Sequence, residues 1–166
     1  MDGLLAKKII GYADARQLRI TRKLGSGNQG LVYAALQHAA VNEIAVKFHK
    51  EPEAYFREKR VYERLTLHAV SQMEGFNVPE LVHTDDEWLV LHLTIIPKPY
   101  VLDFGGAYLD GRPEFSDEIW EQWLHDKLEM FEERWPIVEK VMFGFRLFGV
   151  YLMDIHPRSV AFLDES

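Results

Sequence analysis

The sequence predicts one domain of the α+β class, in which an antiparallel sheet is followed by helices. Its 166 residues and 48% hydrophobic content are enough for one compact core. Short β-rich runs alternate with turn residues up to about residue 115, and apolar residues then recur at helical spacing. We therefore expect a five-stranded antiparallel sheet with one helix over residues 16–97, a linker over 98–115 and a short helical part over 116–166.

The first strands are predicted to form a hairpin around a glycine-rich turn. Residues 18–24 alternate loosely between polar and apolar, and residues 31–36 resume an extended pattern after the glycines. A third β-rich run covers residues 44–48. Pro52 follows it at a position that suits the first turn of a helix.

A helix and two more strands complete this part of the chain. Apolar residues recur at three- and four-residue steps among the charges of residues 54–70, which predicts an amphipathic helix. Residues 81–84 and 88–96 are typical of two strands joined by a polar turn. Pro97 and Pro99 then form a stiff connector, because proline cannot donate a hydrogen bond to a strand ladder.

Two helices are predicted after the linker. Ser116 is followed by two acidic residues, which suits a helix start, and this helix should extend to about Trp135. Pro136 is expected to break or kink it. A second helix, over residues 137–148, would end at Gly149.

Composition and charge exclude several classes of function. The chain has 19 Lys and Arg against 26 Asp and Glu, a net charge of −7 that repels a phosphate backbone and argues against nucleic acid as a partner. Without cysteine there are no disulfides, zinc–thiolate sites or thiol nucleophiles. The longest apolar run, residues 88–97, is about half of the roughly 20 residues that a membrane span needs. No secretory signal is evident, so we expect no membrane partner and a cytoplasmic location.

The glycines at positions 25, 27 and 30 form a G-x-G-x-x-G pattern, which is weak by itself. In a dinucleotide-binding fold a helix begins at these glycines, whereas residues 31–36 are strand-like. In protein kinases the same pattern is a hairpin whose backbone covers the phosphates of a nucleotide. An ordinary tight hairpin is the structural alternative.

Two segments together resemble the first three strands of a protein kinase-like domain. They are Leu24–Tyr33, which contains the glycines, and Ala45-Val46-Lys47. The resemblance implies that ATP binds here and that the lysine contacts its α- and β-phosphates. The implied nucleotide-binding residues are Gly25, Ser26, Gly27, Gly30 and Lys47.

The helix after the third strand resembles the one that carries the family's glutamate. That glutamate holds the lysine, so we expect Lys47 to pair with Glu58, with Glu63 as the second candidate. A solvated helical charge is the alternative for Glu58. We expect the pair to be exposed and to contribute only about 0–1 kcal/mol, so that Lys47→Ala leaves the stability nearly unchanged.

Residues 151–160 resemble the catalytic loop of small atypical and aminoglycoside-type kinases, whose pattern is close to D-x-H-P-x-N. The resemblance implies that Asp154 is the catalytic aspartate, which orients an acceptor hydroxyl and accepts its proton. The family's metal-binding asparagine is replaced by Ser159, whose hydroxyl is a poorer ligand for Mg²⁺ than an amide carbonyl.

The letters of the family's metal motif, D-F-G, occur at Asp103–Gly105, which precedes Asp154 instead of following it. The sequence ends at Ser166, before the position where the family has this motif and its activation segment. If the chain follows the strand order of the family, Asp103 comes after the fifth strand and lies near the adenine. We therefore expect the match to the metal motif to be a coincidence, and Asp103→Asn to have almost no effect on activity or nucleotide binding. The alternative is a rearranged connectivity that brings Asp103 to the phosphates as a metal ligand beside Ser159.

Three functions follow from these patterns. The first is a nucleotide-binding kinase-like protein, a minimal ATP-dependent phosphotransferase that acts on a protein or small-molecule hydroxyl. The second is a catalytically impaired, pseudokinase-type module that binds a protein partner. The third and weakest is a structural α+β domain whose motifs are coincidental. The histidines lack the spacing of a zinc hydrolase site.

Overall fold

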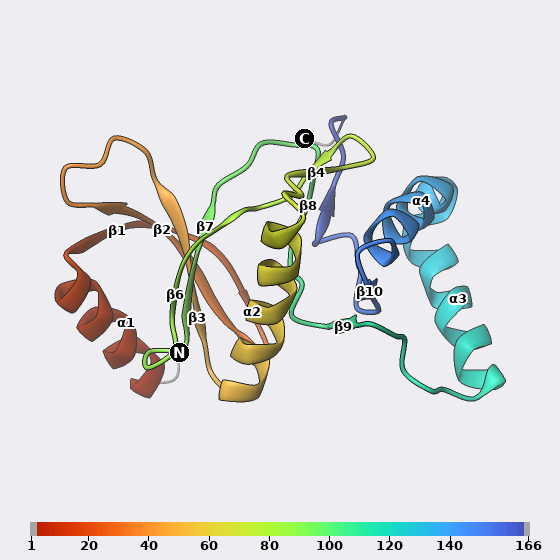
Figure 1. Ribbon diagram of the computed structural model, residues 1–166, viewed down its shortest axis with the longest axis horizontal. Coiled ribbons are helices and arrows are strands. Elements are labelled where there is room, and N and C mark those ends of the chain that lie inside the picture. Colours follow the sequence, from red (N-terminus) through yellow and green to blue (C-terminus); the bar gives the residue numbers. More distant parts are fainter. Residues whose placement is uncertain (1–2, 165–166) are drawn as a thin grey trace. The chain divides into compact units, whose positions relative to one another are not determined.

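The computed structural model describes residues 3–164, which divide into two compact units (Figure 1). The first unit comprises the residues up to Arg60 together with Pro79–Ile95. The second comprises Val61–Val78 and the residues from Ile96 onward. The chain therefore passes from the first unit into the second, returns, and leaves again.

The first unit is built on a five-stranded antiparallel sheet, as predicted, which confirms the α+β class. The strand order is β1-β2-β3-β7-β6. The middle strand β3 is buried along nearly its whole length, in keeping with its apolar sequence. The bounds are β1 (Leu18–Gly27), β2 (Gly30–Gln37), β3 (Ile44–His49), β6 (Leu81–Asp85) and β7 (Val90–Thr94).

Two helices accompany the sheet strands in the sequence, where one was predicted. The expected helix is α2 (Pro52–Leu67), and the additional one is α1 (Gly3–Arg16). Helix α1 lies along the sheet of the first unit (Figure 1) and buries Leu5, Ile9 and Tyr12 in its core. These residues recur at helical spacing, so burial of one apolar face stabilises α1.

Short strands form two small sheets in the second unit. One has the order β11-β8-β5-β4, and the other pairs β10 with β9. Most of these strands lie where the sequence predicted connectors, because two or three residues are too few to show an alternating pattern. The bounds are β4 (Gln72–Met73), β5 (Phe76–Asn77), β8 (Tyr100–Val101), β9 (Ala107–Leu109), β10 (Val150–Leu152) and β11 (Val160–Ala161).

The helices of the second unit are α3 (Asp117–Phe131) and α4 (Trp135–Arg146), joined by a 3-10 turn over Glu132–Arg134. The predicted start is confirmed, because the Ser116 hydroxyl accepts a hydrogen bond from the Ile119 backbone. The predicted break at Pro136 is wrong. Helix α3 ends earlier, at Phe131, and the next residue, Glu132, has a left-handed φ of 51°. Pro136 occupies the first turn of α4, where its missing N–H is not needed.

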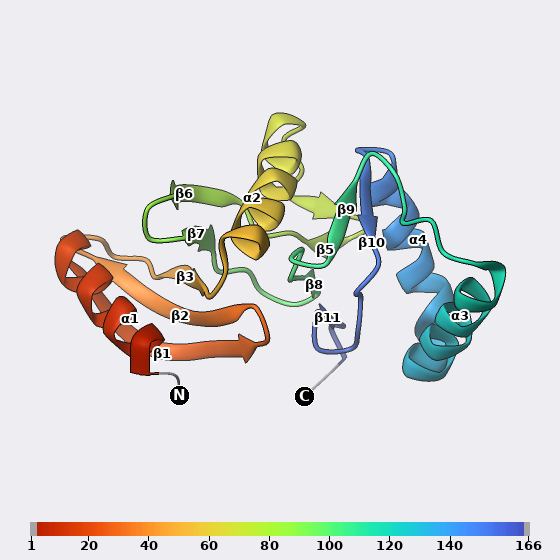
Figure 2. The same cartoon turned by 90° about the horizontal axis from the view of Figure 1, so that it is seen from below.

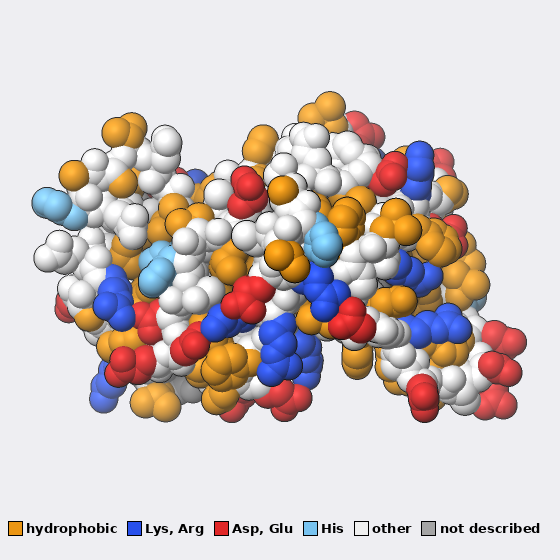
Figure 3. All heavy atoms as spheres, viewed as in Figure 1, with side chains coloured by type: hydrophobic (Ala, Val, Ile, Leu, Met, Phe, Trp, Pro, Cys, Tyr) orange, Lys and Arg blue, Asp and Glu red, His pale blue; other side chains and the backbone are white. Residues whose placement is uncertain are grey.

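Among residues 3–164, no helix is long and apolar enough to cross a membrane. On the face shown in Figure 3, lysine and arginine side chains are interspersed with aspartate and glutamate side chains.

Candidate functional site

The glycine-rich hairpin joins β1 to β2, with Gly27 paired to Gly30 across the turn. Packing of the sheet requires glycine at position 30, because a Cβ there would lie 1.9 Å from the Phe48 carbonyl oxygen of β3. Cβ atoms at Gly25 and Gly27 would meet nothing within 4 Å. Among the three predicted phosphate-binding glycines, Gly30 is therefore required by packing against β3, whereas Gly25 and Gly27 have open space beside the backbone.

Lys47 and Glu58 form a buried ion pair in the first unit. The Lys47 ammonium lies 2.9 Å from Oε1 and 2.7 Å from Oε2 of Glu58. This confirms the predicted contact with Glu58, the first candidate. The expectation of an exposed pair is wrong, since Lys47 is 8% exposed and Glu58 is fully buried.

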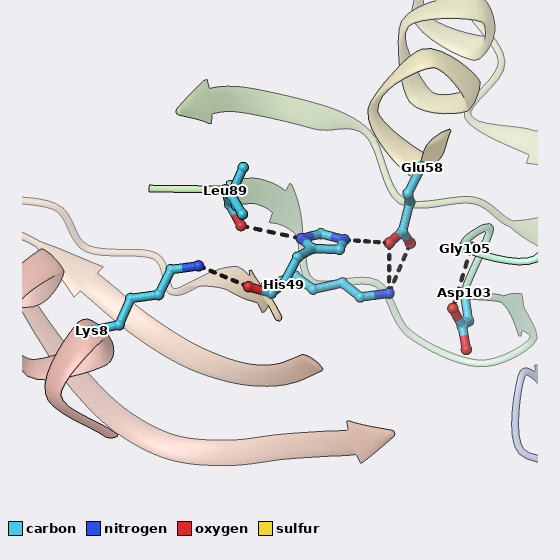
Figure 4. Close-up of polar contacts among 7 residues, drawn as sticks. Lys8, His49, Glu58, Leu89, Asp103 and Gly105 are labelled. Atoms are coloured by element: carbon cyan, nitrogen blue, oxygen red, sulfur yellow. Dashed lines mark hydrogen bonds and ion pairs between the residues drawn. The ribbon is translucent and has the colours of Figure 1, made fainter. Parts of the chain in front are cut away.

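His49 completes this cluster, and the sequence analysis missed it. Its ring is fully buried, with Nε2 2.7 Å from Oε2 of Glu58 and Nδ1 3.3 Å from the Leu89 carbonyl oxygen (Figure 4). Both partners are acceptors, so a ring nitrogen that carries a proton can donate to the partner it faces. The available signal was the two-residue spacing between Lys47 and His49, which puts both on one face of β3.

Glu58 is held in its charged form. Burial alone would raise the pKa of Glu58, but the Lys47 charge and the hydrogen bond from His49 lower it to about 2. One buried carboxylate thus contacts two basic side chains. The cluster therefore holds the Lys47 ammonium against a charged, buried carboxylate.

The Asp103 and Asp154 loops lie side by side in the second unit. Strands β8 and β9 flank the first loop, β10 and β11 flank the second, and the antiparallel pairs are β8 with β11 and β9 with β10 (Figure 2). The backbone N–H of Leu102 also donates to the Ser159 carbonyl at 2.7 Å. Segments about 50 residues apart in sequence are therefore neighbours.

Asp103, Asp154 and Ser159 line one small pocket of about 10 Å³. This volume is close to the roughly 10–15 Å³ that a cavity needs to hold one water molecule. Gly106 forms part of the wall, and a Cβ there would lie only 2.5 Å from Cβ of Asp154. Asp103 therefore lies beside Asp154, as the alternative of a rearranged connectivity requires, whereas its role as a metal ligand stays a prediction.

Phe104 anchors the first of these loops. It is fully buried, with ring centroids 5.3 Å from Tyr62 of α2 and 5.4 Å from Phe145 of α4. Its neighbour Asp103 has a left-handed φ of 66° and accepts a hydrogen bond from the Gly105 backbone at 3.4 Å. Packing of Phe104 thereby fixes the loop that carries the carboxylate.

The Ser159 hydroxyl forms hydrogen bonds within its own loop. Its hydroxyl donates to the His156 carbonyl at 2.9 Å and accepts from the His156 backbone N–H at 3.1 Å. These bonds argue against the predicted metal role of Ser159. The carboxylate of Asp103 offers the hard oxygen ligand that Mg²⁺ prefers.

A magnesium ion would need further ligands in this pocket. Among residues 3–164, no group of three or more His, Asp or Glu side chains is placed to hold a metal. Magnesium commonly binds to one or two carboxylates and completes its shell with phosphate and water. Asp103 would therefore supply only part of a magnesium shell, and the other ligands would have to come from outside these side chains.

Gly106→Ala should lower the free energy of unfolding by about 1–3 kcal/mol, because the new methyl group collides with Asp154 and the loops must separate. Gly111→Ala is the matched control, since its Cβ would meet nothing within 4 Å. Denaturant unfolding of both variants measures the effect. Equal stability of the two variants would contradict the close approach of Gly106 to Asp154.

No family model matches the chain, and no curated protein matches its sequence. The function is therefore inferred from the chemistry of the residues in the two units.

Proposed function

We propose that this protein binds ATP with Mg²⁺ as a kinase-like protein and transfers the γ-phosphoryl group to a hydroxyl of a protein or small molecule. The observation that carries the proposal is the buried Lys47–Glu58 pair. The lysine lies on the third strand, directly after a glycine-rich hairpin, and the glutamate lies on the helix that follows. Protein kinases use a lysine and a glutamate in this order to hold nucleotide phosphates.

The neighbouring carboxylates of the second unit support the same proposal. Asp103 precedes Phe104 and Gly105, and Asp154 lies in a D-x-H-P loop, so each motif has the residues of a kinase motif. Their order along the chain is reversed relative to the family, yet they share one pocket. If both motif matches were coincidental, there would be no reason for Asp103 and Asp154 to line the same pocket.

Each residue has a defined task in the proposed reaction. Lys47 neutralises phosphate charge, Glu58 holds the lysine, and His49 holds Glu58. Asp103 would hold Mg²⁺, which would supply charge neutralisation at the phosphates. Asp154 orients the acceptor hydroxyl. The acceptor oxygen forms the new bond to phosphorus as the bond to the β-phosphate oxygen breaks, the proton passes to Asp154, and ADP leaves.

A second candidate function is a pseudokinase-type module that binds a protein partner. The observation that favours it is Ser159, which replaces the asparagine of the kinase pattern and whose hydroxyl is engaged within its loop. In this case the fold and nucleotide binding remain, but phosphoryl transfer is lost. The two candidates differ in ADP formation.

Titration with ATP, with and without Mg²⁺, tests the binding step. A ligand that binds the native state raises the thermal midpoint in proportion to RT ln(1 + [L]/Kd). We expect a magnesium-dependent rise in wild type and at least about a tenfold weaker affinity in Lys47→Met, because a phosphate partner is lost. The matched control is Lys7→Met, which removes an exposed lysine of α1.

The outcomes separate the candidate functions. Binding that depends on Mg²⁺ and Lys47, together with release of ADP, supports the phosphotransferase. The same binding without ADP formation supports the pseudokinase. If wild type shows no thermal response to ATP, or if Lys47→Met binds as well as Lys7→Met, the nucleotide proposal is wrong. Circular dichroism confirms that each variant is folded before binding is compared.

A further inference from the structure

Helix α3 holds the loop that carries Asp154 at two points, one on each side of the aspartate. The Trp123 indole N–H donates to the Met153 carbonyl at 3.0 Å, and the Lys127 ammonium donates to the Ile155 carbonyl at 2.5 Å. Trp123 and Lys127 are four residues apart and therefore lie on one face of α3. The Asp154 backbone is fixed between the two bonds.

Lys127 is unusual among lysines because it is 6% exposed. Its ammonium lies 5.7 Å from the centroid of the Trp123 ring, a cation–π distance. Burial lowers the pKa of Lys127, whereas the negative charges of Asp154 and, to a lesser extent, Asp126 oppose that change. The buried ammonium therefore interacts with the carboxylate that the proposed reaction uses.

We propose that Lys127 is a positioning residue for Asp154, whose loop it fixes through the Ile155 carbonyl and whose charge its ammonium balances. The proposal rests on the proposed phosphotransferase function and adds a residue from another element to that site. Lys127 does not line the pocket of Asp103 and Asp154, so it acts through the loop.

A hydrogen bond alone does not require a charged donor here. The neutral indole of Trp123 supplies the equivalent bond on the Met153 side. A buried ammonium costs more free energy than a neutral group, because it loses its hydration. The presence of an ammonium group beside Ile155 is explained if its charge acts on Asp154, because a neutral donor has no such charge.

Steady-state ADP formation from Mg²⁺–ATP, with water as the acceptor, tests this role. Lys127→Met should lower kcat by about 10- to 100-fold while KM for ATP stays within about twofold, because the loop misplaces Asp154 but nucleotide binding is retained. Lys127→Arg keeps the charge and should recover part of kcat. The matched control, Lys140→Met, removes an exposed lysine of α4 and should leave both constants unchanged.

A second measurement does not depend on activity. NMR titration of the Lys127 ammonium in the folded 166-residue chain should show a lower pKa in Asp154→Asn than in wild type. The decrease should exceed that in Asp126→Asn, although Asp126 is adjacent in sequence. This comparison leaves Lys127 unchanged, so it applies even if Lys127→Met does not fold.

The outcomes distinguish the two proposals. If wild type forms no ADP, phosphoryl transfer is wrong, and the titration alone decides whether Lys127 acts on Asp154. If wild type forms ADP but folded Lys127→Met keeps its kcat, the positioning role is wrong. It is equally wrong if Asp154→Asn does not change the pKa of Lys127, or changes it no more than Asp126→Asn does.

Discussion

Glu58→Gln is expected to lower the free energy of unfolding by about 3–5 kcal/mol at pH 7, because it leaves two buried basic groups without their carboxylate. Lys47 and His49 both contact Glu58, and all three side chains are buried. Denaturant unfolding measures the loss. Glu63→Gln, at an exposed position of the same helix, should change stability by no more than about 0.5 kcal/mol.

The difference in stability between wild type and Glu58→Gln should depend on pH. The folded protein binds the Glu58 proton with a pKa of about 2, below the ordinary value of 4.5. The stabilisation from Glu58 is therefore complete above about pH 4.5 and is lost as the pH falls toward 2. Between these values the stability of wild type should fall more steeply than that of Glu58→Gln. Parallel pH profiles would contradict a charged, buried Glu58.

Asp154→Asn should lower ADP formation by at least about 100-fold and leave Mg²⁺–ATP affinity within about twofold, because it removes the proton acceptor but not the phosphate ligands. Asp103→Asn should instead weaken Mg²⁺–ATP binding, since a hard cation prefers an anionic oxygen. This replaces the sequence-based expectation that Asp103→Asn is silent, because the two aspartates line one pocket. Calorimetric titration and an ADP assay measure the two effects.

Asp164→Asn provides the control for both aspartate variants, as it removes an exposed carboxylate of the second unit that pairs with Arg134. An active Asp154→Asn protein would disprove the catalytic role of Asp154. Unchanged magnesium dependence in Asp103→Asn would disprove the metal role of Asp103. If both variants bind Mg²⁺–ATP as wild type does and wild type forms no ADP, the pseudokinase-type module is favoured.

The strands of the first unit could be predicted because each has four or more residues with a β-rich composition. Helix α1 was missed although Leu5, Ile9 and Tyr12 recur at helical spacing. Its pattern is blurred by Leu4 and Ile10, which are apolar but 77% and 64% exposed. Periodicity identifies a helix only when the opposite face is polar.

The contact between Lys47 and Glu58 was predictable from the resemblance to protein kinase-like domains, whereas the role of His49 was not. That role depends on the packing of α2 against β3, which brings the Glu58 carboxylate within reach of both β3 side chains. Spacing along a strand shows that Lys47 and His49 share a face, but it does not show what lies above that face.

The proximity of Asp103 to Asp154 could be given only as an alternative from sequence. It depends on the pairing of β8 with β11 and of β9 with β10, all strands of two or three residues. Strands this short carry no register signal, and their partners are distant in sequence. The order of the motifs suggested separation, whereas strand pairing determines their positions.

The two carboxylate loops are joined by strand pairing and not by adjacent sequence. If the chain were cut within residues 111–115, which belong to no helix or strand, Asp103 and Asp154 would lie on separate fragments. Formation of their pocket would then be a bimolecular association that depends on protein concentration. In the intact chain the intervening residues supply effective concentration, which makes the association intramolecular.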